Sequence, residues 1–331
     1  LRLPSRPDCV HDSSQNELRE IYREIEVELP SDDSLPFVQV LDEGLALPDL
    51  SGYYEVLYDE TRPRESEADG DRTRIVLYFP IHAELAVAQI ELVLEALGLD
   101  DYRLNEKRIA RKDYLEAYKQ YYEPFQISPR LVIVPSWDRG SEREAAARKA
   151  AGETGVLSLY LDPGLAFGTG KHPTTQLCLE YLDEAFASPD RAPRRLIDAG
   201  AGSGILALGA LLFGAESVYA FDIDGNATVA CRQNLELNAV SGELIFEHGG
   251  FDLPGLAERP ADLLLGNLTA AVLLQNQAFV DASQARRMIL SGILTEQQDR
   301  VVEAFTSTHW DFCSGRESDG WVLLEFEARS A

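Results

Sequence analysis

One glycine-rich turn carries the residue types best suited to binding a small molecule. The segment Leu196-Ile-Asp-Ala-Gly-Ala-Gly-Ser-Gly-Ile205 predicts a buried strand, a turn with three glycines and the start of a helix. Glycines allow positive φ angles and a close approach of the backbone to a ligand. Such a turn at the carboxyl end of a strand is where α/β sheets bind nucleotides. It predicts a nucleotide or nucleoside site, with a plain strand-to-helix turn as the alternative.

A second acidic residue follows at the distance that a nucleoside site requires. Asp222 closes the next predicted strand, 22 residues after Gly200. A carboxylate at this place can accept hydrogen bonds from both hydroxyls of a ribose. Asp222 therefore indicates a nucleoside without identifying it. Asp224, at the start of the following helix, is better explained as a helix N-cap.

The spacing of the glycines distinguishes two classes of nucleoside site. Gly200, Gly202 and Gly204 form Gly-x-Gly-x-Gly, and Ile205 stands where dinucleotide-binding turns have their third glycine. With Asp198 two residues ahead of the first glycine, the turn resembles that of class I methyltransferases, which bind S-adenosylmethionine. A dinucleotide site stays open, because the segment 202–207 fits the looser dinucleotide pattern.

Asn267 closes a later predicted strand, at the place that faces the reactive methyl group in the methyltransferase fold. Its planar amide can accept a hydrogen bond from an amine and donate another. A helix cap is the alternative. The sequence after Asn267 lacks the Pro-Pro-aromatic pattern common in enzymes that methylate amide or base nitrogens. The residues therefore favour an aliphatic amine as substrate.

The second half of the chain predicts the scaffold that positions these residues. Predicted strands alternate with predicted helices, which is typical of a doubly wound α/β domain. Continuously apolar strands such as 262–266 indicate a sheet buried on both faces. We expect a Rossmann-like methyltransferase domain over 156–331. Its predicted strands are 195–198, 217–222, 243–248, 261–267, 288–293 and 321–327.

The first 110 residues predict a separate small α+β domain. After a polar lead-in over 1–20, alternating polar and apolar residues predict half-buried strands, and a helical pattern that stops at Gly98 has a good C-cap. The order strand, helix, strand, strand, helix, strand is typical of a ferredoxin-like domain. The predicted strands are 22–29, 52–58, 74–79 and 102–109, the helices are 35–47 and 83–97, and 59–72 is an exposed loop.

A connecting segment over 111–155 is expected between the two domains. It begins with a predicted amphipathic helix over 113–122 and continues into a short apolar strand over 131–135. The stretch 141–151 is rich in alanine and charge, so it predicts either a helix or a flexible insertion.

Composition restricts the classes of function. The 331 residues are 45% hydrophobic and 26% charged, as expected for a globular chain, and no run of about 18 apolar residues predicts a membrane span. No secretory signal is visible, and the four cysteines form no CxxC motif. We therefore expect a cytoplasmic protein without a metal site. The net charge of −26 disfavours nucleic acid and favours a basic partner; a salt-rich cytoplasm is the alternative explanation.

One segment is more specific than the glycine turn. Leu161-Asp-Pro-Gly-Leu-Ala-Phe-Gly-Thr-Gly-Lys-His-Pro-Thr-Thr175 resembles the signature of the bacterial ribosomal protein L11 methyltransferases. The resemblance extends over about 110–327. Further segments match the family in the same order: 121–125, 131–137, the turn after Asp198, 221–224, 266–268 and 290–293. The departures are Lys171, where the family usually has Thr, Ala201, and the Gly-Asn-Leu-Thr run at 266–269.

The resemblance implies the fold and the roles of the site residues. It implies a substrate-recognition domain, a linker and a methyltransferase domain. The loop 164–170 with Phe167 is expected to act as a lid over the cofactor, and His172 is expected to position that loop rather than to act as a base. The implied cofactor contacts are Thr175, Gly200, Gly202, Gly204, Asp222 and Asn267, with Asn267 also orienting the amine.

The resemblance also implies the reaction. The family transfers methyl groups from S-adenosylmethionine to lysine ε-amines and the amino-terminal amine of ribosomal protein L11, a small basic protein. We expect a monomer that binds neither nucleic acid nor membrane. A protein-lysine methyltransferase with a different protein substrate and a non-catalytic cofactor-binding module are the alternatives.

Overall fold

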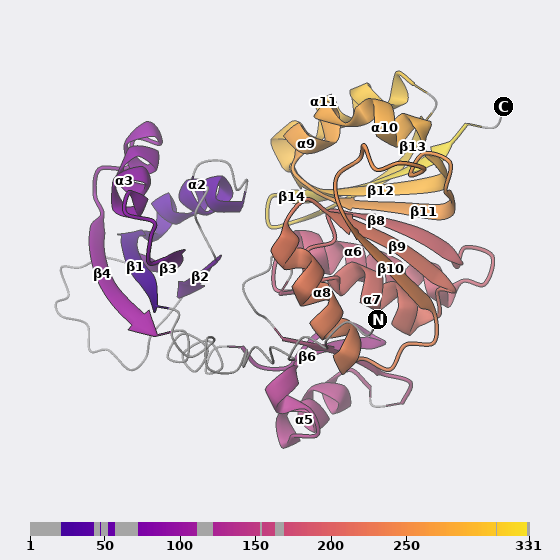
Figure 1. Cartoon of the computed structure of the whole chain (residues 1–331), viewed down its shortest axis with the longest axis horizontal. Helices are drawn as coiled ribbons and strands as arrows, with labels where there is room; N and C mark the ends of the chain where they lie inside the picture. The colour runs from indigo at the N-terminus through magenta and orange to yellow at the C-terminus, as the bar shows by residue number, and fades with distance from the viewer. Residues whose placement is uncertain are drawn as a thin grey trace, which may run out of the picture. The chain divides into compact units, whose positions relative to one another are not determined.

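The computed structural model describes residues 21–42, 47, 52–56, 72–110, 122–152, 154–162, 169–308 and 310–329. The chain divides into two compact units, Leu1–Tyr121 and Tyr122–Ala331, whose helices and strands are labelled in Figure 1. The predicted lead-in 1–20 lies outside the described residues. So do the predicted helix 113–122 up to residue 121 and nearly all of the predicted loop 59–72.

Unit 1 contains a four-stranded sheet with two helices. Its strands follow the order β2-β3-β1-β4, and every neighbouring pair is antiparallel. This is the arrangement expected for the predicted βαββαβ layout. In chain order the elements are β1 (Ile21–Pro30), α2 (Ser31–Asp42), β2 (Gly52–Val56), β3 (Arg72–Pro80), α3 (Ala86–Ala96) and β4 (Arg103–Ala110).

Alternation along β1 and β3 builds the core of unit 1. Every second side chain of these strands is buried against α2 and α3, as the alternation in sequence predicts. The core includes Ile25, Val27, Leu29, Phe37, Ile75, Leu77, Phe79, Ile90 and Leu94.

The predicted helix over 35–47 has the wrong boundaries. The helix begins at Ser31, before Pro36, and ends at Asp42. Pro36 and Gly44 weaken the predicted boundaries in the sequence itself, and Pro36 lies inside the observed helix. The run Ser31-Asp-Asp-Ser34 starts the helix one turn earlier, because polar and acidic residues there stabilise free backbone N–H groups.

Unit 2 is built on a seven-stranded sheet in the order β10-β9-β8-β11-β12-β14-β13. Neighbours from β10 to β12 are parallel, and β14 is antiparallel to both β12 and β13. The predicted doubly wound α/β class is confirmed. The strands are β8 (Arg195–Ala199), β9 (Ser217–Asp222), β10 (Glu243–His248), β11 (Pro260–Asn267), β12 (Gln284–Leu294), β13 (Trp310–Ser318) and β14 (Trp321–Ala328).

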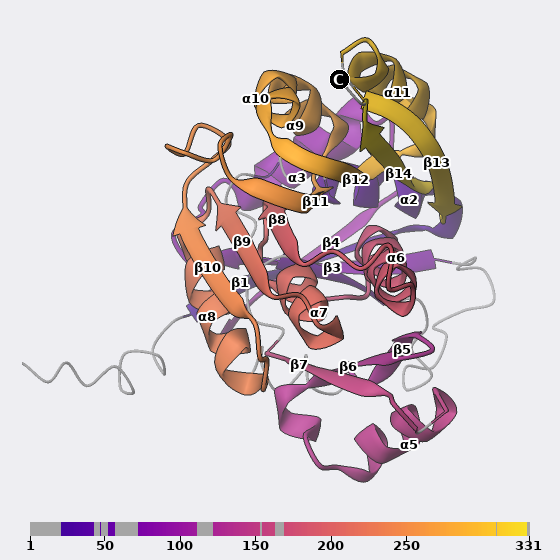
Figure 2. The same ribbon diagram turned by 90° about the vertical axis from the view of Figure 1, so that its right-hand side faces the viewer.

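Helices cover both faces of this sheet. In Figures 1 and 2, α9, α10 and α11 lie on one face, and α6, α7 and α8 lie on the other. Helices on both faces explain why the central strand β11 carries the continuous apolar run Leu263-Leu-Leu265. The helices are α6 (Pro173–Ala187), α7 (Ile205–Phe213), α8 (Gly225–Leu237), α9 (Ala270–Gln275), α10 (Gln277–Ala282) and α11 (Gln298–Thr306).

A small second sheet belongs to the same unit. Strands β5 (Phe125–Ser128), β6 (Leu131–Pro135) and β7 (Leu157–Leu161) pair in that order. In Figure 2 this sheet lies beyond α6 and α7, with α5 (Glu142–Ala150) on its outer side. Residues 122–155, which we assigned to the connecting segment, are thus part of unit 2. The stretch 141–151 forms a helix, with the Ser141 side chain accepting from the Glu144 amide at its start.

No helix among the described residues is both long enough and apolar enough to cross a membrane.

Candidate active site

Three neighbouring strands end at one edge of the large sheet. β8 lies between β9 and β11, with Ala199 paired to Phe221 on one side and to Gly266 on the other. The next residues, Gly200, Asp222 and Asn267, therefore follow at the same level. The chain leaves β8 toward β9 and returns on the opposite side at β11, and α/β sheets bind ligands at such a reversal.

Each glycine of the turn after β8 has its own structural reason. All three have positive φ: 70° at Gly200, 51° at Gly202 and 78° at Gly204. A Cβ at Gly200 would lie 2.4 Å from Leu268 Cδ2, and one at Gly204 would lie 2.6 Å from Cys231 Sγ. Packing against α8 thus accounts for glycine at 204, whereas the amide of Gly202 donates to Asp222.

Asp222 ties this turn to the end of β9. Its Oδ2 accepts a hydrogen bond from the Gly202 amide at 2.8 Å, and its Oδ1 accepts one from the Asp224 amide at 2.8 Å. A carboxylate has about four lone-pair sites, so each oxygen can still accept from a hydroxyl. Asp224 caps α8 by accepting from the Asn226 amide at 2.9 Å, as predicted.

Asn267 and Thr175 meet across the site, although 92 residues separate them. Asn267 Nδ2 lies 3.4 Å from Thr175 Oγ1, the hydroxyl to which it donates. Thr175 is buried in the first turn of α6. The alternative explanation of Asn267 as a helix cap is wrong, because Thr269 caps α9 by accepting from the Val272 amide.

His172 fixes the start of α6. It is the N-cap residue, and its Nδ1 accepts from the Thr174 amide at 3.3 Å. Its ring makes an edge-to-face contact with Trp321, with centroids 4.8 Å apart. This capping nitrogen and the packed ring support the predicted positioning role.

Asp198 is the buried acid beneath the glycine turn. Its side chain is 1% exposed, and it accepts a hydrogen bond from the Ala207 amide at 3.1 Å. Burial raises the pKa of Asp198 to about 7, and the nearby charge of Asp222 adds to the increase. A positively charged group bound here would be attracted to the ionised carboxylate.

Asn234 makes two contacts at this site that were not predicted from the sequence. Asn234, buried on α8, donates to the Ser203 carbonyl at 2.9 Å and accepts from the Asp162 amide at 2.8 Å. It therefore joins the glycine turn to the start of the signature segment. An Asn in mid-helix carries little information in a single sequence, because most such residues face solvent.

Tyr122 holds the other end of the signature segment. Its hydroxyl donates to the Thr169 carbonyl, and its ring lies under the Lys171 ammonium, 5.0 Å from the centroid. Burial lowers the pKa of Lys171 below its ordinary value. Phe167, the expected lid residue, lies outside the described residues.

The groups at this edge fit a nucleoside cofactor that carries a positive charge. Asp222 offers a carboxylate for ribose hydroxyls, and the glycine turn lies directly beside it, with the Gly202 amide bonded to Asp222. Asp198 is a buried carboxyl beside them, and a bound cation would favour its ionised form. S-adenosylmethionine combines a ribose with a sulfonium and an ammonium group, so these residues match its chemistry.

Comparison with known proteins gives one consistent result. The family model for ribosomal protein L11 methyltransferase matches residues 24–329. A protein of that name from Leptospira interrogans is 34% identical over 314 residues, covering 93% of this chain and 99% of the relative. Another from Pseudomonas aeruginosa is 35% identical over 300 residues and 90% of each chain.

A solved structure agrees with these matches. The ribosomal protein L11 methylase from Lactobacillus delbrueckii aligns with a TM-score of 0.52 at 27% identity, covering 63% of this chain and all of that one. The family model and the two sequence relatives each cover nine tenths or more of the chain. The chain therefore belongs to the ribosomal protein L11 methyltransferase family.

Proposed function

We propose that this S-adenosylmethionine-dependent protein methyltransferase methylates lysine ε-amines and the amino-terminal α-amine of ribosomal protein L11. The observation that carries the proposal is the Asn267–Thr175 pair beside the glycine turn, at the edge where β8 and β11 end. Family membership supports both the reaction and the substrate. The absence of a Pro-Pro-aromatic run after Asn267 supports an aliphatic amine.

The side chains divide the work between holding the cofactor and holding the amine. S-adenosylmethionine supplies an electrophilic methyl group, and the protein supplies position. We assign Gly200, Gly202 and Asp222 to the nucleoside and Thr175 to the wall beside it. Gly204 acts on the cofactor through the shape of the turn, since its missing side chain makes room for α8. Phe167 is proposed as a lid residue.

Asn267 is the proposed orienting residue for the amine. Because its Nδ2 is engaged by Thr175, its Oδ1 remains available to accept an N–H from the incoming amine. That hydrogen bond directs the nitrogen lone pair toward the methyl group. A lysine amine with an ordinary pKa near 10.4 is mostly protonated at neutral pH. The amine therefore loses its proton to solvent before it attacks, and positioning and partial desolvation of the neutral amine then lower the barrier.

The two units take different parts of the task in this proposal. Unit 1 recognises the basic protein substrate, and unit 2 binds the cofactor and transfers the methyl group. The net charge of −26 supports a basic partner and opposes direct binding of nucleic acid. We propose a cytoplasmic monomer.

A mass-shift assay with unmethylated ribosomal proteins tests the function. We expect L11 alone to gain mass in steps of about 14 Da per methyl group when the enzyme and S-adenosylmethionine are present. Fragmentation of the product identifies the amines. Gain on another protein instead would keep the reaction and reject L11 as substrate. Cofactor binding without any gain would show a non-catalytic module.

A further inference from the structure

The outer face of α3 in unit 1 exposes large apolar side chains. Leu85 and Leu92 are each 67% exposed, and Ala88 between them is also exposed. Positions i, i+3 and i+7 lie on one face of a helix, so these three residues form a ridge, called here the α3 ridge. Ile90 and Leu94 on the opposite face are fully buried. The α3 ridge therefore lies outside the hydrophobic core of unit 1.

Acidic side chains border this ridge on one flank. Glu91 and Glu95 are exposed and one turn apart, so they lie on the same side of α3. The helix then ends in a Schellman turn, in which Gly98 has φ 72° and the Leu99 amide donates to the Leu94 carbonyl at 2.9 Å. This turn brings the following residues back alongside the helix.

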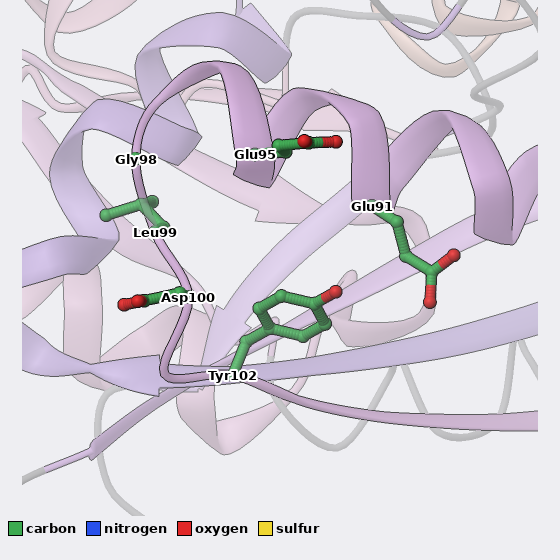
Figure 3. A pocket seen from close by; sticks show the side chains of 6 residues that line it. All are labelled: Glu91, Glu95, Gly98, Leu99, Asp100 and Tyr102. Carbon is green, nitrogen blue, oxygen red and sulfur yellow. The ribbon is translucent and has the colours of Figure 1, made fainter.

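A hollow of about 570 Å³ lies between the acidic flank and the start of β4. It is lined by Glu91, Glu95, Gly98, Leu99, Asp100 and Tyr102. Figure 3 shows the Tyr102 ring below α3, with its hydroxyl end directed toward the side of the helix that carries Glu91. A lysine or arginine side chain has the length and charge to enter such a hollow and to contact an aromatic ring there.

The carboxylates of the hollow differ from two neighbouring acids of unit 1, Asp101 and Glu106. Nearby acids are paired: Asp101 with Arg72 at 3.0 Å, and Glu106 with Arg23 at 2.6 Å. Within the described part of the chain, Glu91, Glu95 and Asp100 have no ion pair. No Lys or Arg occurs from 81 to 102. The carboxylates of the hollow are thus available to pair with a cationic group of a partner.

We propose that the α3 ridge and the acidic hollow together form the docking surface for a basic segment of the protein substrate. This inference rests on the proposed function and gives unit 1 a defined contact face. Apolar side chains of the segment cover Leu85 and Leu92, and one lysine or arginine enters the hollow beside Tyr102. Charge complementarity selects this occupant, because three unpaired carboxylates next to an apolar ridge repel anionic surfaces and match a segment that is both basic and apolar.

Two double variants test the two halves of this surface separately. Glu91→Gln with Glu95→Gln removes charge from the hollow, and Leu85→Ser with Leu92→Ser removes the ridge. Asp299→Asn with Glu303→Gln is the matched control, because it removes two exposed charges one turn apart on α11 in unit 2. It therefore has the same effect on net charge.

Binding is measured apart from methylation, by titrating each enzyme with L11 in the absence of methyl donor. We expect each test variant to raise the Kd for L11 about tenfold and the control to change it less than about twofold. Added salt should weaken the wild type more than the acid variant. In turnover assays the test variants should raise KM and leave kcat unchanged, because the surface lies outside the machinery of transfer.

The possible outcomes test the docking surface and the proposed function separately. If the control variant raised the Kd for L11 as much as the acid variant did, the effect would come from overall charge and not from the hollow. A lower melting temperature for the free ridge variant, without a higher Kd, would mean that the ridge packs inside the protein. Binding of L11 without methylation would retain this surface and reject the proposed function. An unchanged Kd for L11 in both test variants, with methylation intact, would reject the docking surface and retain the proposed function.

Discussion

Replacing Asp198 with Asn tests whether the site keeps a buried carboxyl at a cost in stability. Burial raises the pKa of Asp198 from the ordinary 3.8 to about 7 in the folded protein. The folded state therefore holds the proton more tightly than the unfolded chain does. Asp198 favours folding most at low pH, and this contribution is lost as the pH rises from about 4 to about 7.

The size of the effect follows from the pKa difference. The difference is about 3 pKa units, and one unit corresponds to about 1.36 kcal/mol, so the ionised side chain costs about 4 kcal/mol at pH 8. At pH 5 only about 1 unit has been crossed, and the cost is between about 1 and 2 kcal/mol. Asn stays neutral, and its side-chain oxygen can still accept from the Ala207 amide. We therefore expect Asp198→Asn to stabilise the free protein by about 3 kcal/mol more at pH 8 than at pH 5.

Urea unfolding followed by tryptophan fluorescence measures this difference. All three tryptophans, at 137, 310 and 321, belong to unit 2, so the signal reports the unit that contains Asp198. Asp299→Asn, which changes an exposed acid, is the control. The same variant should bind S-adenosylmethionine more weakly at pH 8, because it removes a negative charge near a cation. A stability gain that is equal at the two pH values would refute the reasoning, and so would unchanged cofactor affinity.

Three further substitutions give distinct results. Gly204→Ala should lower the free energy of unfolding, measured by urea unfolding, by about 2 to 4 kcal/mol, because Gly204 has a positive φ and a Cβ there would meet Cys231 Sγ. Adding Cys231→Ala should restore part of this loss, and an absence of recovery would show that the contact with Cys231 is not the cause. Asp222→Asn should weaken cofactor binding, measured by calorimetry, at least about tenfold, because an amide cannot accept hydrogen bonds through both of its terminal atoms. Asp224→Asn is the control: it keeps a good N-cap and should leave cofactor affinity unchanged, and equal losses in the two variants would point to a general effect on the helix. Asn267→Ala should lower kcat about a hundredfold with little change in cofactor Kd, and full turnover at saturating cofactor would disprove its orienting role.

Periodicity in the sequence located most strands and helices, because one face or both faces of each are buried. Strand β13 was not predicted. It pairs only with β14 at the edge of the sheet, and most of its side chains are exposed, so it lacks the apolar alternation on which the prediction depends. The four-residue strand β5 is too short to give such a pattern. Segment 122–155 was assigned to a connection for a related reason: its small sheet packs against helices far along the chain.

The sequence by itself determined which residues bring chemistry to the site. Glycines at 200, 202 and 204, an acid after the next strand and an Asn at a strand end are local signals, since each depends on its own turn. Only the tertiary structure decided how they act together. Strand order places β8 between β9 and β11, and the packing of α6 brings Thr175 to Asn267. Asn234 and the raised pKa of Asp198 likewise depend on what the folded chain packs around them. Local spacing fixes residue types, whereas burial and long-range contacts fix their charge and partners.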